Sequence, residues 1–378
     1  MQFIDLKSQY NLIKEDVLNS IETVLNHGQY IMGPEVVELE EKLAQYVGIK
    51  YCVSCSSGTD ALLMSLMGLD VGPGDAVFTT PFTFVATAEV ISLVGATPIF
   101  VDIDSKTYNI DSQKLEIEVK RISEEGNLIP KAIIPVDLFG LPADYSSIQT
   151  IANEFNLFVI EDAAQGFGGS INGKKSGSFG DMGATSFFPA KPLGGYGDGG
   201  AVFTNDGDLF EKLQSIRVHG KGENKYDNIR IGLNGRLDTI QAAILLNKLK
   251  IFPNELEKRE SAATLYSEKL LQKFTTPFIP SGYSSAWAQY SILADSSEHR
   301  SECQQRLKDE GIPSAVYYPI PLHLQTAYNY LNYKLGDFPI SEEMSNRIFS
   351  LPMHPYLTEV EIDQIASILN NVKDKNYD

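Results

Sequence analysis

The chain has 378 residues, of which 43% are hydrophobic and 21% are charged, and its formal net charge is −18. This length is too great for one simple core and suits a large domain followed by a smaller one. The acidic balance excludes nucleic acid as a partner, because no basic excess is available to neutralise phosphates.

Two further properties of the sequence concern location and metal binding. The N-terminal segment MQFIDLKSQYNLIKEDV has acidic residues where a signal peptide would be apolar, and no stretch reaches the roughly 18 apolar residues of a membrane span. We therefore expect a cytoplasmic protein without a membrane partner. Cys52 and Cys55 have the C-x-x-C spacing, but no second pair completes a metal site. We expect them to be small apolar residues of a buried strand, with no bound metal.

Short β-branched runs alternate with helical patterns from residue 50 to about residue 205. The strand candidates are 51–55, 76–80, 98–102, 131–136, 157–162, 183–188 and 201–204. Helical patterns between the earlier ones include 60–69, 83–94 and 143–155. This alternation predicts an α/β fold with a mostly parallel sheet that helices cover on both faces. In such sheets ligands bind beyond the carboxyl ends of the strands.

The character of the sequence changes near residue 252. Apolar residues at helical spacing predict a long helix over residues 235–250. A second helix, over residues 254–274, and shorter mixed elements follow Phe252-Pro253. We therefore predict a large domain over residues 1–252 and a smaller α+β C-terminal domain over residues 253–378.

Two motifs carry ionisable groups near predicted strand ends. The strand 157–162 ends in Glu161-Asp162. An acid at the end of a strand can be a functional carboxylate, but taken alone it is more often a helix cap. Residues 183–200, GATSFFPAKPLGGYGDGG, contain a single lysine, Lys191, in a Gly-rich turn beside Phe187 and Phe188. An ordinary loop lysine is solvated, but these neighbours suit a partly desolvated ammonium. Desolvation lowers the pKa of a lysine, and the neutral amine can form a Schiff base with an aldehyde cofactor.

Two other motifs suit the binding of a phosphorylated heterocycle. Residues 56–60, Ser-Ser-Gly-Thr-Asp, join a strand to a helix and would direct free N–H groups toward a phosphate, although the same residues form ordinary capping turns. The segment has neither the lysine of a P-loop nor a G-x-G-x-x-G pattern. Phe82 and Phe84 follow the strand 76–80, and each can stack on a planar ring or belong to the core.

Together these motifs resemble those of the DegT-type sugar aminotransferases, a branch of the fold-type I enzymes that use pyridoxal phosphate (PLP). The matching segments are SSGTDALLMSLMGLDVGPGD, TTPFTFVATAEV, VIEDAAQGFG, TSFFPAKPLGGYGDGGAVFTNDGDL and IGLNGRLDTIQAAIL, and the resemblance extends from FIDLKSQY to LPMHPYL. It implies the PLP-transferase fold of type I, aminotransferase activity and PLP as the cofactor.

The resemblance implies a role for each matching residue near the cofactor ring. Lys191 forms the Schiff base with the cofactor and then acts as general base. Asp162 pairs with the pyridine nitrogen and keeps it protonated, so that the ring accepts electrons. Gln165 lies near the phenolic oxygen, and Phe82 stacks on the ring.

The resemblance also assigns the cofactor's phosphate group. Gly58, Thr59 and Ser186 are expected to hold it within one subunit. Asn234, in the segment Asn-Gly-Arg, is expected to reach the phosphate of the neighbouring subunit's cofactor, which implies a homodimer with shared active sites.

A locally basic segment is the predicted binding site for substrate carboxylates. Residues 217–236 contain five basic and two acidic residues, a local excess of +3 in a strongly acidic chain. The basic residues are Arg217, Lys221, Lys225, Arg230 and Arg236. A charge run of this length is often a solvated face, but an arginine here could grip a carboxylate with two hydrogen bonds. Arg236 is the first candidate and Arg230 the second. His219, Tyr318 and His323 are candidates for sugar contacts or for structural roles.

The resemblance implies L-glutamate as the amino donor and a nucleotide-linked 3-keto-sugar as the acceptor, in cell-surface polysaccharide biosynthesis such as that of O-antigen. UDP-2-acetamido-3-oxo-glucuronate is the best match, and a dTDP-linked 3-keto-6-deoxyhexose is the alternative. Two other classes are a non-catalytic regulator with the same fold and a nicotinamide dehydrogenase. Retention of Lys191, Asp162 and Gln165 argues against the first class, and the lack of a G-x-G-x-x-G pattern in the strand-to-helix turn at residues 56–60 argues against the second.

Overall fold

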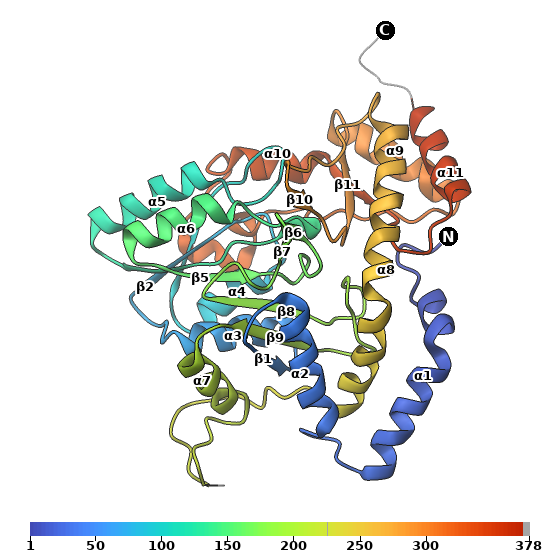
Figure 1. The fold of residues 1–378 in the computed structure, drawn as a ribbon. Coiled ribbons are helices and arrows are strands. Elements are labelled where there is room, and N and C mark those ends of the chain that lie inside the picture. Colours follow the sequence, from blue (N-terminus) through green and yellow to red (C-terminus); the bar gives the residue numbers. More distant parts are fainter. Residues whose placement is uncertain (225, 373–378) are drawn as a thin grey trace.

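The computed structural model describes residues 1–224 and 226–372 (Figure 1). A seven-stranded sheet, in the strand order β1-β9-β8-β5-β4-β2-β3, lies at its centre. Its strands are β1 (Tyr51–Cys55), β2 (Asp75–Thr79), β3 (Thr97–Phe100), β4 (Ile129–Ile133), β5 (Phe158–Asp162), β8 (Met182–Ser186) and β9 (Gly200–Thr204). All seven predicted strands are present, and their ends differ from the prediction by three residues or fewer.

The sheet is mostly parallel. β2 pairs in parallel with β3 and β4, β4 with β5, and β5 with β8. β9 is antiparallel to both of its neighbours, β8 and β1, so β1 points the same way as the other five strands. The carboxyl ends of six strands therefore meet at one end of the sheet, which we call the carboxyl end.

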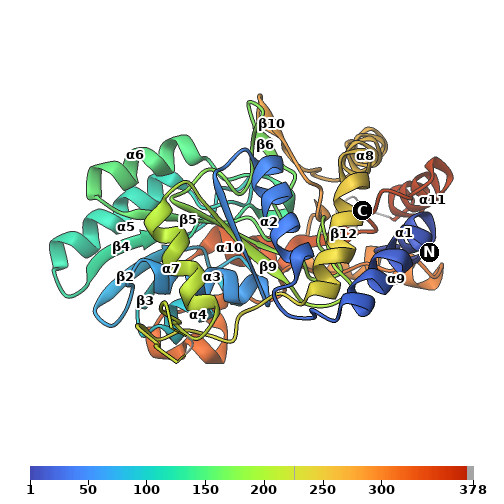
Figure 2. The ribbon, with the colours of Figure 1, turned by 60° about the horizontal axis from the view of Figure 1, so that its bottom comes forward.

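Helices cover both faces of this sheet (Figure 2). One face packs against α3 (Gly58–Gly68), α4 (Ala86–Leu93) and α7 (Gly207–Arg217). The other packs against α5 (Ser112–Glu125), α6 (Tyr145–Phe155), α2 (Pro34–Val47) and α8 (Thr239–Leu270). A strand covered on both faces must point apolar side chains to each face in turn, and β2 does so. Val77 packs under α3, α4 and α7, while Ala76 and Phe78 pack under α5 and α6.

Local sequence signals set where these helices start and stop. The side chains of Asp111, Asp144 and Asp206 accept hydrogen bonds from backbone N–H groups in the first turns of α5, α6 and α7, as N-caps do. α5 ends at Gly126, whose φ of +67° is the left-handed conformation that glycine adopts at little cost. Cys52 and Cys55 are buried in β1, as expected, and carry no disulfide.

The prediction of two helices separated at Phe252-Pro253 was wrong. α8 runs without interruption from Thr239 to Leu270, with Pro253 inside it. A proline in a helix interior removes one hydrogen bond and crowds the preceding turn. Here Phe252 before it, and Glu255 and Arg259 after it, are buried, so packing on both sides outweighs the local penalty.

The C-terminal part is smaller and has an α+β composition. It contains the antiparallel pair β11 (Tyr290–Leu293) and β12 (Ile348–Leu351), the helices α9 (Ser297–Asp309), α10 (Pro339–Arg347) and α11 (Glu359–Asn370), and the short 3₁₀ helices η2 (Leu322–Leu324) and η3 (Thr326–Leu331). This arrangement confirms the predicted fold class. The division at residue 252 stays a proposal, because α8 supplies Phe252 to a core of the first part and Tyr266 to that of the second.

The remaining elements join these two parts. α1 (Leu6–His27) lies along α8 (Figure 1), with Ile13 and Val17 packed against Ile244. A small sheet of β10 (Tyr283–Ser284), β6 (Ser170–Ile171) and β7 (Lys174–Lys175) was not predicted, and η1 (Leu138–Gly140) follows β4. Among the described residues, no helix has both the length and the apolar character needed to cross a bilayer.

Candidate active site

The carboxyl end of the sheet brings together the four motifs that the sequence analysis singled out. β1 leads into the segment at Gly58, β2 leads to Phe82, β5 ends in Asp162, and β8 ends in Ser186 shortly before Lys191. Because β5 and β8 are adjacent and parallel, the acid and the lysine leave the sheet side by side. This is where ligands bind in sheets of this type.

The N-terminus of α3 forms a cradle with the end of β8. The hydroxyl of Ser57 accepts a hydrogen bond from the backbone N–H of Asp60, 3.0 Å away, and so caps the helix. Gly58 opens the helix against Ser186 so closely that a Cβ on Gly58 would lie 2.6 Å from the Ser186 Cβ. The half-buried Thr59 follows in the same turn. Free N–H groups, nearby hydroxyls and the helix dipole suit a phosphate group.

Asp162 is a buried carboxyl group with two donors. Its side chain is 5% exposed. Oδ2 accepts a hydrogen bond from the Thr87 hydroxyl at 2.8 Å, and Oδ1 accepts one from the backbone N–H of Ala164 at 3.2 Å. Burial raises the pKa of Asp162, while these two hydrogen bonds and the charge of Lys191 oppose that rise. The carboxyl group is thus held in one orientation by the Thr87 hydroxyl of α4 and by the backbone two residues further on.

Lys191 sits in a compact turn between β8 and β9. Its backbone N–H donates to the carbonyl of Phe188 at 2.9 Å, and the N–H of Gly195 donates to the carbonyl of Phe187 at 2.7 Å. Burial lowers the pKa of the Lys191 amine, and the negative charge of Asp162 partly opposes this. The two groups are therefore electrostatic neighbours, and the amine is easier to deprotonate than an ordinary lysine.

Gln165 joins an aromatic cluster that closes one side of the site. Its Oε1 accepts a hydrogen bond from the backbone N–H of Phe139 at 2.8 Å, and its Nε2 donates to the hydroxyl of Tyr318 at 3.0 Å. The ring of Phe82 is fully buried and meets the rings of Tyr318 and Phe139 edge-on, with centroids 6.2 and 6.4 Å away. The predicted stacking of Phe82 on a cofactor stays a prediction.

The segment that ends in Asn234-Gly235-Arg236 lies beside the cradle. The backbone N–H of Ser56 donates to the carbonyl of Gly235 at 3.1 Å. Asn234 is exposed, and its side-chain oxygen accepts a hydrogen bond from the guanidinium of the half-buried Arg236. Within one chain, these two candidate residues are therefore next to the end of β1.

The family of the chain follows from a comparison of its whole length with known proteins. The model of the DegT/DnrJ/EryC1/StrS aminotransferase family matches residues 11–370. The chain belongs to this family. The predicted resemblance is thereby confirmed, and with it the prediction that the chain is an aminotransferase.

Individual relatives agree with this assignment. The aminotransferase is 49% identical to the UDP-2-acetamido-2-deoxy-3-oxo-D-glucuronate aminotransferase of Pseudomonas aeruginosa, over 98% of this chain and 100% of the relative. A crystal structure of a DegT/DnrJ/EryC1/StrS aminotransferase from Brucella abortus has a TM-score of 0.95 and 52% identity, over 98% of each chain. The ntda protein of Bacillus subtilis, solved with its cofactor PMP (pyridoxamine phosphate) bound, has a TM-score of 0.87 and 31% identity, over 96% of this chain and 82% of that one.

The basic segment of the aminotransferase is less uniform than the sequence suggested. Arg217 is buried and pairs with Glu40, and it also donates to the carbonyl of Ser54 at 3.0 Å. Its charge is therefore neutralised inside the protein and does not belong to an anion-binding patch. Arg230 is partly exposed in the same segment, and Lys225 lies outside the described residues.

The histidine candidates have different surroundings. His219 is exposed, and its backbone N–H donates to the carbonyl of Leu233 at 2.8 Å. His323 is 1% exposed, its Nε2 is 3.0 Å from Glu342 Oε1, and its ring meets the ring of Phe338 edge-on. We therefore leave His323 out of the substrate contacts proposed below, because its side chain is enclosed by the protein.

A pair of buried acids, Asp137 and Glu161, lies next to Asp162, and the sequence analysis named only Glu161 of the two. Asp137 and Glu161 are both 0% exposed and interact with each other. Glu161 accepts hydrogen bonds from two backbone N–H groups, while Asp137 accepts them from the hydroxyls of Tyr145 and Ser176, 2.8 and 2.7 Å away. Burial raises the pKa of both acids, so the pair holds a proton that two separate surface carboxylates would lose.

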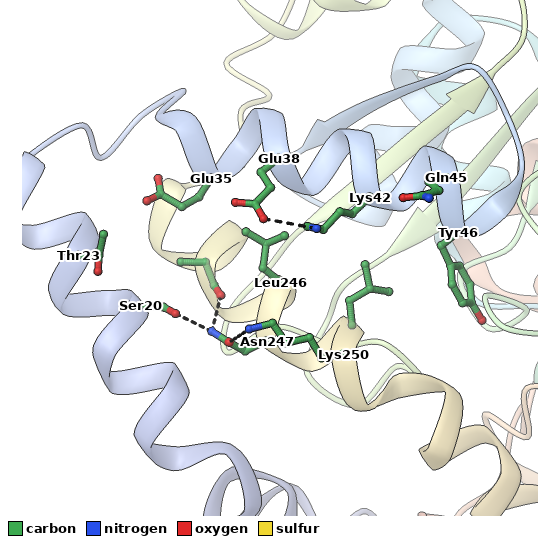
Figure 3. A pocket seen from close by; sticks show the side chains of 12 residues that line it. Ser20, Thr23, Glu35, Glu38, Lys42, Gln45, Tyr46, Leu246, Asn247 and Lys250 are labelled. Atoms are coloured by element: carbon green, nitrogen blue, oxygen red, sulfur yellow. Dashed lines mark hydrogen bonds and ion pairs between the residues drawn. The ribbon is translucent and has the colours of Figure 1, made fainter.

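A hollow of about 550 Å³ lies elsewhere, between α1, α2 and α8 (Figure 3). Several of its polar side chains are bonded to one another (Figure 3). Lys42 pairs with Glu38 at 3.6 Å, Asn247 donates to the hydroxyl of Ser20 at 2.7 Å, and Lys250 donates to Asn247 at 2.9 Å. None of the residues at the carboxyl end of the sheet lines this hollow.

Proposed function

We propose that this aminotransferase moves an amino group from L-glutamate onto a nucleotide-linked 3-keto-sugar at the carboxyl end of its sheet. The observation that carries the proposal is the pairing of a desolvated lysine, Lys191, with a buried carboxyl group, Asp162, beside a phosphate cradle. Pyridoxal phosphate is the cofactor of this aminotransferase, and the cradle, the amine and the carboxyl group fit its phosphate, its aldehyde and its pyridine nitrogen.

The cofactor supplies an electron sink once its ring nitrogen is protonated. We assign the remaining tasks to side chains of the chain. The amine of Lys191 would hold the cofactor through its aldehyde and would accept and return the proton that the reaction moves, for which its lowered pKa is suited. Asp162, fixed by the Thr87 hydroxyl, would keep the ring nitrogen protonated. Gln165, fixed by the backbone N–H of Phe139, would contact the ring oxygen.

The phosphate assignment uses the cradle of one chain and a residue of a second. Gly58 and Thr59 offer N–H groups at the start of α3, and Ser186 offers a hydroxyl. We propose that Asn234 reaches the phosphate of the cofactor in the partner subunit of a homodimer. Its exposed position at the end of β1 leaves it available to a second chain.

We propose UDP-2-acetamido-3-oxo-glucuronate as the sugar substrate, in cell-surface polysaccharide biosynthesis. The name of the relative with 49% identity supports this choice. Arg236 is the first candidate for the carboxylate of the sugar and of glutamate, because a guanidinium has five N–H donors and the hydrogen bond to Asn234 uses one of them. Arg230 is the second candidate, and His219 and Tyr318 are candidates for hydroxyl contacts.

The amine-transfer step is tested first with Lys191→Ala. Mixing the wild-type protein with glutamate should shift the absorbance of bound PLP, whereas the variant should bind PLP without this shift. A non-catalytic regulator would show no shift in either protein. Amine transfer by Lys191→Ala at the wild-type rate would refute the proposed role of the lysine.

The substrate is tested with a panel of UDP- and dTDP-linked keto-sugars. In the half-reaction that starts from the protein loaded with pyridoxamine phosphate, Arg236→Ala should slow amine transfer to the uronate far more than to a 6-deoxy sugar, because only the uronate has the carboxylate. Arg121→Ala is the matched control, since Arg121 is exposed on α5 and pairs with Glu118 and Glu125. Equal losses of both substrates in Arg236→Ala would refute the carboxylate role.

A further inference from the structure

A buried lysine of α8 contacts the turn that carries Lys191. Lys248 is 1% exposed, and its Nζ donates to the backbone carbonyl of Gly194 at 2.6 Å. The same Nζ lies 4.2 Å from the centroid of the Tyr196 ring. Both contacts fall within five residues of Lys191, on the stretch of chain that leads from it to β9.

A second side chain of α8 holds the same turn. Oε1 of Gln241 accepts a hydrogen bond from the backbone N–H of Tyr196 at 2.9 Å. Gln241 and Lys248 are seven residues apart, or two helical turns, so both project from one face of α8. The carbonyl of Gly194 and the N–H of Tyr196 are thus fixed from the same helix.

The turn itself is packed too tightly to rearrange without affecting Lys191. A Cβ on Gly194 would lie 2.4 Å from the carbonyl oxygen of Pro189 and 2.6 Å from that of Phe188. Residues 188 and 194 therefore touch across the base of the turn, with Lys191 between them. A shift of Gly194 away from α8 would move the base of the turn and with it the backbone of Lys191.

Burying a lysine at position 248 costs free energy that an apolar residue there would not cost. Leu245 and Phe252, one turn before and one turn after Lys248 on α8, are buried and apolar. An ammonium group is expensive to bury unless it is hydrogen-bonded or paired. Burial lowers the pKa of Lys248 to about 8, and the charge of Glu255 only partly offsets this. The hydrogen bond that Lys248 donates to the Gly194 carbonyl explains why position 248 is a lysine and not an apolar residue.

We infer that Lys248 is a positioning residue whose contacts with Gly194 and Tyr196 fix the Lys191 turn to α8 and so keep the Lys191 amine next to Asp162. The inference rests on the role proposed for Lys191. Lys248 itself touches no reacting group. Its effect on the reaction is indirect, because a catalytic group displaced by about 1 Å can lose on the order of a hundredfold in rate.

The test compares Lys248→Met with Lys250→Met in the PLP-loaded protein. Methionine keeps most of the apolar volume of lysine but has no donor. Lys250 is exposed two residues further along α8 and donates to Asn247 rather than to the Lys191 turn, so its variant is the matched control. Hydrogen exchange of the backbone over residues 187–197 should become at least about tenfold faster in Lys248→Met, because a charge-assisted hydrogen bond is lost.

Turnover is measured on the same two variants. Lys248→Met should lose at least about tenfold in kcat with KM for the sugar changed less than about twofold, since the substrate contacts remain. Lys250→Met should match the wild type in exchange and in turnover. Wild-type exchange of the turn in Lys248→Met, or faster exchange with an unchanged kcat, would overturn the inference.

Two further variants keep the outcomes separable. If Lys248→Met does not fold, Gln241→Leu removes the other contact between α8 and the turn, and a folded Gln241→Leu with wild-type exchange and kcat overturns the inference. Amine transfer that persists in Lys191→Ala would instead refute the proposed function. Loss of transfer in Lys191→Ala together with an unaffected Lys248→Met would refute only the positioning role.

Discussion

The cradle at the start of α3 gives the sharpest prediction, because a single methyl group tests it. In Gly58→Ala the new Cβ would lie 2.6 Å from the Ser186 Cβ and 3.2 Å from its Cα. Carbon atoms in contact are normally about 3.5 to 4.0 Å apart, so α3 and β8 must separate by about 1 Å. Overpacking of this kind costs about 1 to 3 kcal/mol, and the separation also moves the N–H groups that face the phosphate.

The magnitude expected for cofactor binding follows from the same shift. If most of that cost falls on the bound state, the Kd for PLP should rise by roughly tenfold to a hundredfold, since about 1.4 kcal/mol corresponds to a factor of ten. Pyridoxal has the same ring and aldehyde but no phosphate. Its Kd should change by less than about twofold in Gly58→Ala. Absorbance titration of the cofactor-free protein with each compound gives both constants.

The control for this prediction lies at the other end of the same helix. In Gly68→Ala the new Cβ would meet Leu213 at 3.5 Å, an ordinary contact. Alanine also stabilises a helix by about 0.5 to 1 kcal/mol relative to glycine. Gly68→Ala should therefore bind PLP like the wild type. An unchanged Kd for PLP in Gly58→Ala, or an equal loss for PLP and pyridoxal, would refute the phosphate cradle.

Two further predictions follow from the ionisable groups of the site. The charge of Asp162 raises the pKa of Lys191, so Asp162→Asn should lower the pH midpoint at which an amine reagent labels Lys191 in the cofactor-free protein, as followed by mass spectrometry. A midpoint that stays or rises would contradict this. Burial raises the pKa of Asp137 to about 6 and also raises that of Glu161, so this pair binds more protons in the folded than in the unfolded chain above about pH 4, and its contribution to stability falls as the pH rises. Asparagine at position 137 carries no charge, so Glu161 no longer faces a second carboxylate. Between about pH 5 and about pH 8 the Tm of Asp137→Asn should therefore fall less than the Tm of the wild type. Parallel Tm curves for the two proteins would show that Asp137 and Glu161 do not share a proton.

The fold could be predicted closely wherever a short-range pattern decides it. The strands of the central sheet are continuous apolar runs between turn residues, and such runs have few alternatives. α8 is the instructive exception, because Pro253 is a strong local signal for a helix end. Burial of Phe252 and Arg259 against different parts of the chain decides otherwise, and no local pattern reports that burial. The strands β6 and β7 have two residues each, too few to show a period.

The site divides in the same way. Asp162 ends β5 and Lys191 lies in the turn after β8, both within long motifs, and the parallel pairing of β5 and β8 brings the two segments together. Thr87 reaches Asp162 across 75 residues of sequence, and its place in a helical pattern gives no sign of this. Arg217 looked like part of a basic patch, but its partner Glu40 is 177 residues away. Contacts over such separations depend on the complete fold, so the sequence alone could not assign them.

The protonation states of the site explain how an acidic chain can bind anions. With a net charge of −18, the protein as a whole repels a phosphorylated cofactor and a nucleotide-linked sugar. Burial raises the pKa of Asp137 and Glu161 and makes this pair hold a proton. The negative charge near the carboxyl end of the sheet is therefore smaller than the count of acidic residues suggests. The N–H groups of α3 and the guanidinium groups of Arg230 and Arg236 then act over short distances, where the overall charge of the chain matters least.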